Sequence, residues 1–307
     1  MASGLAEAEV VRDYAYTREK LVWNEGIMSD QKTIADLIEH RYGISSGAGA
    51  DMPAEGELAS ILSHCTHRRF TDQPVSDALL EVLLAAAFSA PAKSDLQQGA
   101  VVVIRDPEKR KAIADLMPAM PWIGTCPVMM IFLGDSRRIR RICEMRGKPF
   151  ANDHLDAFLN AASDASIALA TFIRAAEAVG LGCCPISVVR NHIDRIAEIV
   201  ELPDHVFPMA GMTAGYPVAE GFVSMRLHPA VNVHVDRYDD SNLEAEIDAY
   251  DQRRDARFSI PEEKQRRVDA FGTSDFYGWS EDKARQVSTT EREQLAAYLK
   301  RKGFNLD

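Results

Sequence analysis

The sequence predicts a protein of the α+β class, in which helices and strands alternate without forming a repeat. The apolar spacing of residues 76–89 is typical of a helix, and an apolar, strand-like stretch follows at 99–105. The same alternation gives a short helix at 107–117 and a strand at 126–134. No G-x-G-x-x-G turn follows a strand, which argues against a Rossmann dinucleotide fold.

The second half of the chain continues the alternation. An Ala-rich helical region covers 153–179 and has Gly180 placed as its C-terminal stop. Strands are expected at 183–189 and 209–214, with a helix at 191–200 between them. The pattern Thr290-Glu291-Arg292-Glu293 predicts a capping-box start for the last helix.

Composition excludes several classes of protein. The chain has 307 residues, 46% of them hydrophobic, and a net charge of −11, which disfavours a general nucleic-acid binder. No signal peptide or apolar run of membrane-spanning length is recognisable, so no membrane partner is expected. The five cysteines lack C-x-x-C spacing, and no converging set of metal ligands is found. We expect a cytoplasmic protein with reduced, mostly buried thiols and no metal.

The first part of the chain differs from the rest. A helical pattern at 29–41 carries an apolar stripe, and a stretch of small residues at 43–50 has the composition of a linker. We therefore divide the chain into an N-terminal extension, 1–57, and a main domain, 58–307. The apolar stripe favours docking of the extension, and a simple tail is the alternative.

Two separated basic clusters suit one phosphorylated cofactor. The first is 64–70, sequence HCTHRRF, and the second is 224–227, sequence SMRL. Arginine offers a fixed fork of donors that matches phosphate oxygens, and a threonine hydroxyl adds a neutral donor. On the local sequence alone, a solvated basic turn is the alternative interpretation of each cluster.

Longer stretches of sequence carry a resemblance to a known family. They are 71–76 (TDQPVS), the leucine-rich 79–84, 89–97 (SAPAKSDLQ), 180–187 (GLGCCPIS), Leu202-Pro203, 211–217, Arg226 and the terminal stretch 279–304. In order and spacing these resemble the FMN-dependent nitroreductase family, and within it the oxygen-insensitive nitroreductase and flavin reductase branch. The resemblance covers the chain from about Leu58 to its end.

The resemblance implies both a fold and a cofactor site. The fold would be an α+β sandwich with a mainly antiparallel central sheet flanked by helices, in an intertwined homodimer with the Ala-rich helix at its interface. FMN would lie between the two subunits. The implied cofactor-binding residues are His64, Cys65, Thr66, Arg68, Pro91, Ala92, Lys93, Asp95, Gln97, Pro185, Ile186, Ser187 and Arg226.

The resemblance also assigns roles to these residues. Thr66, Arg68 and Arg226 would hold the phosphate of FMN, and the ring edge would lie near residues 64–65 and the turn 91–93. Residues 185–187 would pack against one face of the isoalloxazine and offer a backbone amide toward N5. For the side chain of Lys93, a solvated loop lysine is the equal alternative.

Three positions depart from the family's pattern. Cys65 stands where many members carry Arg, Ser224 where many carry Lys, and Asp95 where many carry Asn. Two of these changes reduce positive charge near the cofactor and the third, Asp95, adds negative charge, so phosphate binding would be weaker or the flavin potential would shift. The stretch 271–278 also lacks the arginines that could meet the extra phosphate of NADPH, so NADH and NADPH both stay open as hydride donors.

The implied activity is an FMN-dependent NAD(P)H oxidoreduction in two half-reactions at one site, with no catalytic side chain required. The acceptors would be small, flat and electron-poor, such as nitroaromatics or quinones, and 137–154 is a candidate lid over them. Alternatives keep the flavin but change the reaction, to flavin reduction, reductive dehalogenation or dehydrogenation of a dedicated metabolite. A non-catalytic flavin-binding protein is a further alternative.

Overall fold

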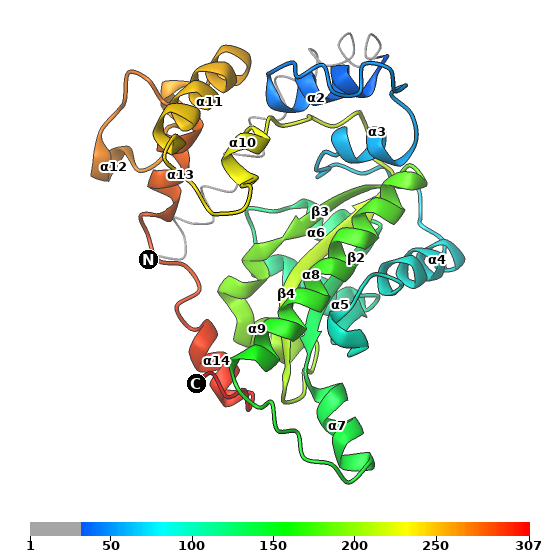
Figure 1. Cartoon of the computed structure of the whole chain (residues 1–307). Helices are drawn as coiled ribbons and strands as arrows, with labels where there is room; N and C mark the ends of the chain where they lie inside the picture. Colours follow the sequence, from blue (N-terminus) through cyan, green and yellow to red (C-terminus); the bar gives the residue numbers. More distant parts are fainter. Residues whose placement is uncertain (1–31) are drawn as a thin grey trace. The chain divides into compact units, whose positions relative to one another are not determined.

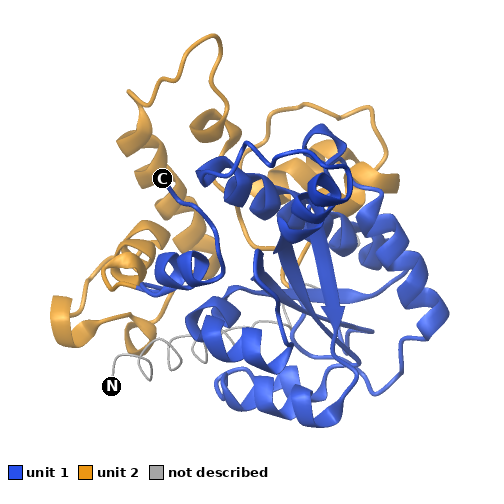
Figure 2. Cartoon of the chain, turned by 90° about the horizontal axis from the view of Figure 1, so that it is seen from below, with its two compact units in different colours: residues 1–11, 66–220, 291–307 blue, residues 12–65, 221–290 orange. Residues whose placement is uncertain are grey.

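The computed structural model describes residues 32–307, which form two compact units (Figure 2). The first unit comprises residues 66–220 and 291–307, and the second comprises 32–65 and 221–290. Residues 1–31, which include most of the N-terminal extension and the start of the helix predicted at 29–41, lie outside the described residues.

A four-stranded antiparallel sheet is the centre of the first unit (Figure 1). Its strands are β1 (Gly99–Val103), β2 (Val128–Asp135), β3 (Gly182–Ile186) and β4 (Val206–Gly215), in the spatial order β1-β2-β4-β3. Gly99 pairs with Gly134, Val128 with Ala214 and Gly182 with Gly215. The predicted α+β fold with an antiparallel central sheet is therefore confirmed.

The first unit also contains helices, several of which pack on the sheet. They are α4 (Asp77–Phe88), η3 (Lys93–Asp95), α5 (Pro107–Asp115), α6 (Trp122–Thr125), α7 (Arg137–Met145), α8 (Leu155–Ala178), η4 (Ser187–His192), α9 (Ile193–Ile199) and α14 (Leu295–Arg301). The long helix α8 ends just before Gly180, whose φ of 79° is a left-handed conformation that favours glycine. Among the described residues, no helix is both long and apolar enough to span a membrane.

The capping box predicted at 290–293 is wrong. The last helix begins at Leu295 and has Gln294 as its N-cap, without a side-chain hydrogen bond to the helix. Arg292 has a left-handed φ of 60°, so a helix could not start at this point. The residue types at 290–293 suit a helix cap, but the backbone there only connects the second unit's chain to residues 291–307, which we call the C-terminal arm.

The core of the first unit depends on β2, whose residues are buried from Val128 to Gly134 because both faces of the strand are covered. Met130 and Phe132 pack with α4 and α8, where Phe172 meets Phe132 edge to face with ring centroids 5.9 Å apart. Figure 1 shows α8 running along the sheet. A sheet covered by long helices gives rigid strand ends on which loops can carry function.

The second unit is mainly helical. Its helices are α2 (Ile34–Tyr42), α3 (Gly56–Leu62), α10 (Pro229–Asn232), α11 (Leu243–Phe258), η5 (Glu262–Lys264), α12 (Val268–Phe271) and α13 (Trp279–Val287). A capping box between Thr33 and Asp36 fixes the start of α2. The small-residue stretch after α2 folds back on it, since the amide of Ala35 donates to the carbonyl of Gly49 (3.3 Å). Buried Met225, Tyr250 and Phe258 form the local core.

Within this unit, His40 is buried against Arg257. Arg257 donates to the backbone carbonyl of His40 (2.5 Å) and lies 2.9 Å from its ring Nε2. An arginine donor needs a lone pair on the imidazole, which protonation removes. Burial, with the charges of Arg257 and Arg41, lowers the pKa of His40 to about 4.

This lowered pKa predicts a pH-dependent stability. Between the ordinary histidine value of 6.5 and the folded value of about 4, the unfolded chain binds more protons at His40 than the folded chain. The free energy of unfolding should therefore fall as the pH drops through this window, and His40→Gln should make that fall shallower. Urea unfolding at several pH values measures both, and an unchanged slope in the variant would contradict the assignment.

Candidate functional site

The segment 66–68 lies beside the first residues of β3. The amide of His67 donates to the carbonyl of Cys183 (2.9 Å), and a side-chain carbon on Gly182 would lie only 2.6 Å from the ring of His67. Glycine at 182 thus permits this close approach. Half-buried Arg68 places its guanidinium 5.8 Å from the centre of the Trp122 ring. The contacts leave Thr66 and Arg68 next to the strand that leads to the predicted residues 185–187.

The cysteines near this segment are structural. Burial raises the pKa of Cys184, and the nearby Arg68 opposes that rise. Burial also raises the pKa of Cys126 to about 11. A buried thiol that stays protonated is a poor nucleophile, so neither cysteine is suited to covalent catalysis.

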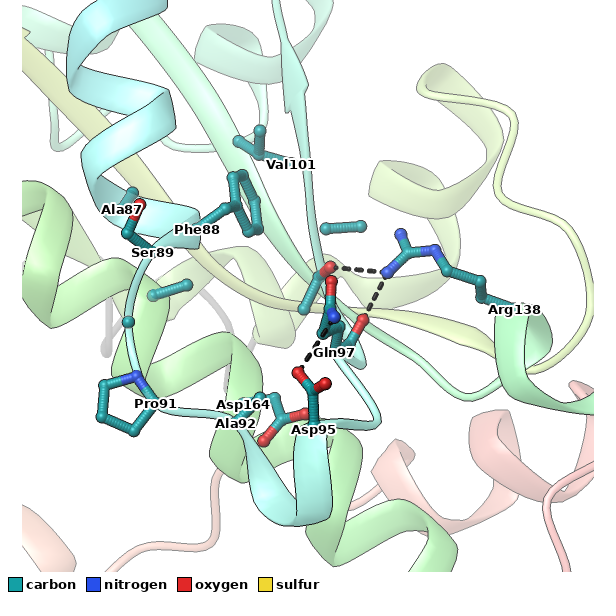
Figure 3. Close-up of a pocket in the computed structure, with 14 residues that line it drawn as sticks. Ala87, Phe88, Ser89, Pro91, Ala92, Asp95, Gln97, Val101, Arg138 and Asp164 are labelled. Atoms are coloured by element: carbon teal, nitrogen blue, oxygen red, sulfur yellow. Dashed lines mark hydrogen bonds between the residues drawn. The ribbon is translucent and has the colours of Figure 1, made fainter.

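A pocket of about 550 Å³ lies between the end of α4, the loop after it and β1 (Figure 3). Four of the predicted cofactor residues line it: Pro91, Ala92, Asp95 and Gln97. Its other lining residues include Phe88, Val101, Arg138 and Asp164. The pocket thus presents apolar and polar surface in similar amounts.

Asp164 of α8 holds the loop that lines this pocket. One carboxylate oxygen accepts the amide of Lys93 (2.9 Å) and the other accepts the amide of Gln98 (2.8 Å). Asp164 is only 4% exposed, so these two charge-assisted bonds compensate for burying its charge. From the other side, Arg138 of α7 donates to the carbonyls of Gln97 and Gly99, as Figure 3 shows.

The backbone of this loop is strained. Ser94, Asp95 and Gln97 have φ values of 50°, 57° and 52°. Residues other than glycine seldom adopt this left-handed region of the backbone. Gln97 also donates from Nε2 to Oδ1 of Asp95 (3.0 Å). Such a conformation persists only where surrounding bonds impose it, and it is often found at functional sites. The side chain of Lys93 is exposed.

Residues 185–187 form the end of β3 and the first residue of η4. Pro185 and Ser187 are exposed, whereas Ile186 is buried in the sheet. Arg292, from the C-terminal arm, donates to the hydroxyl of Ser187 (3.2 Å), and Gln294 donates to the carbonyl of Asn191 (2.8 Å). The arm therefore places an arginine beside a predicted flavin-contacting residue.

The remaining predicted residues belong to the second unit. His64 and Cys65 are half-buried, while Arg226 is exposed and donates to the hydroxyl of Ser224 (2.8 Å). The predicted residues thus form three groups with separate supports, at 66–68 with 185–187, at 91–97, and at 64–65 with Arg226.

Several residues of these groups were missed by the sequence analysis. Asp164 could have been suspected, since it is an acidic residue in an Ala-rich apolar helix. Arg138 and Arg292 carry no such signal, because their partners lie 41 and 105 residues away. The candidate lid, 137–154, contains α7, and Arg140 there pairs with Asp153 (2.5 Å) and lies over the ring of Phe150. Its role as a lid stays a prediction.

Comparison with known proteins agrees with this fold. The model of the Nitroreductase family matches residues 61–216, and that of the Nitroreductase family, C-terminal domain, matches 225–307. The FMN reductase [NAD(P)H] of Bacillus subtilis is 30% identical over 253 residues, which cover 81% of this chain and 98% of that protein. The chain belongs to the nitroreductase family.

Solved structures give the same result. Bacillus megaterium NfrA2 superposes with a TM-score of 0.74 at 29% identity, covering 82% of this chain and all of that one. The NADPH:FMN oxidoreductase of Vibrio harveyi, solved in complex with NAD+, superposes with a TM-score of 0.69 at 27% identity and covers 80% of this chain and 97% of that one. The family and fold predicted from the sequence are confirmed.

The support from Asp164 yields a testable prediction. Asp164→Asn replaces one acceptor with an amide donor that faces a backbone N–H, so the free energy of unfolding should fall by about 1–3 kcal/mol. Hydrogen exchange at the amides of Lys93 and Gln98 should become faster. Asp115→Asn, at an exposed ion pair with Lys111, is the control and should cost less than about 1 kcal/mol. Unchanged exchange at both amides would refute the role of Asp164.

Proposed function

We propose that this protein oxidises NADH or NADPH with bound FMN and reduces a small, flat, electron-poor acceptor such as a nitroaromatic or a quinone. Membership of the nitroreductase family makes the chain an FMN-dependent NAD(P)H oxidoreductase. The acceptor is the part that we propose. The observation that supports this acceptor class is the pocket at 91–97. Its loop backbone is held by Asp164, and its apolar surface suits a planar ring.

The chemistry of the donors fits FMN. Arg68 and Arg226 present guanidinium forks suited to a phosphate dianion, and Thr66 adds a hydroxyl. Pro91 and Ala92 supply apolar surface for the ring, and Pro185 lies exposed at the end of β3. When bound, FMN supplies the hydride chemistry, while these residues bind and orient it and keep water from its face. No side chain is needed as a nucleophile.

A homodimer is part of this proposal. On α8, which packs against α4, the large apolar residues Leu155, Leu159 and Ile167 are 50%, 57% and 38% exposed. On α4, Val82 and Phe88 are also exposed. Apolar side chains on two neighbouring helices are typical of a surface that a second copy covers. We propose that two copies meet on these helices and share the flavin.

Reduction of free flavin is a second candidate reaction. The relative from Bacillus subtilis is named FMN reductase [NAD(P)H], and free flavin is itself flat and electron-poor. The bound FMN, once reduced by the nicotinamide, would then reduce free flavin as the acceptor.

An anaerobic absorbance titration tests the proposed function. The purified protein, loaded with FMN, is titrated with NADH and with NADPH, and then with a nitroaromatic, a quinone or free riboflavin. We expect the flavin band to bleach with a nicotinamide and to recover with at least one acceptor. Bleaching without recovery by any acceptor would refute the proposed acceptor class, and no bleaching would refute the hydride-transfer reaction.

The phosphate assignment gives a second prediction. Arg68→Ala should weaken FMN binding by roughly tenfold or more, because it removes a charge-assisted fork to the phosphate. Lys93→Ala should have a smaller effect, since its exposed ammonium would meet the ring edge and not the phosphate. Flavin released on denaturation measures retention in each variant, with exposed Arg69→Ala as the control. Equal retention in the Arg68 and Lys93 variants would refute the assignment of the phosphate end.

A further inference from the structure

Arg41, the last residue but one of α2, is buried in the second unit, and its guanidinium donates to backbone carbonyls. Its side chain is 4% exposed. Nε donates to the carbonyl of Leu62 (2.9 Å), Nη1 to that of Ser224 (2.7 Å) and Nη2 to that of His64 (2.5 Å). The matched family models begin at residue 61, so Arg41 precedes the region that defines the family.

The three carbonyls belong to the two basic clusters recognised in the sequence and to the helix before the first. Leu62 is the last residue of α3, where carbonyls have no partner within the helix and a cation is favourable. His64 begins the cluster 64–70, and Ser224 begins the cluster 224–227. The amide of Arg226 also donates to the carbonyl of Arg41 (2.9 Å). Arg41 therefore joins both clusters through three hydrogen bonds, and a fourth ties it to the end of α3.

This fixation determines where Arg226 points. Val223 and Met225 are buried, whereas Arg226 is exposed. The hydroxyl of Tyr250 donates to the carbonyl of Met225 (3.1 Å), so three consecutive residues, 224–226, each have a backbone group held. With its backbone held between buried neighbours, Arg226 has an exposed side chain, whose guanidinium donates to the hydroxyl of Ser224.

We propose that Arg41 is a positioning residue that sets the place of Arg226 for the phosphate of FMN. The inference rests on the proposed function, and it assigns the N-terminal extension a role in cofactor binding. Each nitrogen of Arg41 donates to a carbonyl, so Arg41 acts through the two clusters and not as a phosphate ligand. The resemblance implies that Cys65 and Ser224 stand where many members of the family carry cations, so the placement of Arg226 would determine more of the phosphate affinity here.

The test compares FMN with riboflavin, which has the same ring but no phosphate. Full-length protein freed of flavin is titrated with each flavin, and quenching of flavin fluorescence gives both affinities. In Arg41→Gln we expect FMN affinity to fall by roughly tenfold or more and riboflavin affinity by less than about twofold. A general loss of structure would lower both affinities alike and would contradict the inference.

Two further variants keep the test sharp. Leu37→Ala removes a buried apolar side chain from the same helix, so it should lower the melting temperature but leave the FMN-to-riboflavin affinity ratio unchanged. Arg41→Lys keeps the charge but loses the planar fork, and we expect it to lower the ratio as Arg41→Gln does. A wild-type ratio in Arg41→Lys would show that charge acts and not position, and would overturn the inference.

The two failures are distinguishable. If the wild-type protein prefers FMN to riboflavin and Arg41→Gln keeps that preference, positioning by Arg41 is refuted and the proposed function stands. If the wild-type protein shows no preference for FMN, the assignment of a phosphate site is refuted, and the inference falls with it.

Discussion

The candidate flavin pocket depends on one buried carboxylate. Asp164 lies on the long helix α8 and accepts two amides that lie five residues apart in sequence, at Lys93 and Gln98. Between these two amides, three residues have a left-handed backbone conformation, which is energetically unfavourable. Bonds from outside the loop, such as those to Asp164, are needed to hold it. Because α8 also packs on the sheet, the helix transmits the rigidity of the core to the loop.

Arginines serve two different purposes in this molecule. Arg41 and Arg138 donate to backbone carbonyls and hold segments in place, whereas Arg226 is exposed and Arg68 lies beside β3 next to Trp122. A guanidinium that is committed to neutral carbonyls fixes geometry, while one that faces solvent can neutralise a phosphate. On our proposal, the affinity for FMN depends in part on Arg226, whose position Arg41 sets. This distinction is not visible in a count of charges.

The sequence predicted the sheet and most helices because apolar periodicity records burial directly, as in β2 and α8. It predicted the pocket residues 91–97 only through a family resemblance. Asp164, Arg138 and Arg41 act on partners that are distant in sequence. Asp164 alone has a local signal, as an acidic residue in an Ala-rich helix, and that signal does not identify its partners. The false capping box at Thr290 shows the converse, since matching residue types do not start a helix where the backbone turns away.

We propose that FMN lies against the loop that Asp164 holds and that arginines bind its phosphate. The crystal structure of the FMN-loaded protein tests it most directly. We expect the isoalloxazine edge against Pro91, Ala92 and Lys93 and the phosphate within hydrogen-bonding distance of Arg68 and Arg226. A flavin bound elsewhere, or a phosphate that contacts neither arginine, would contradict the account.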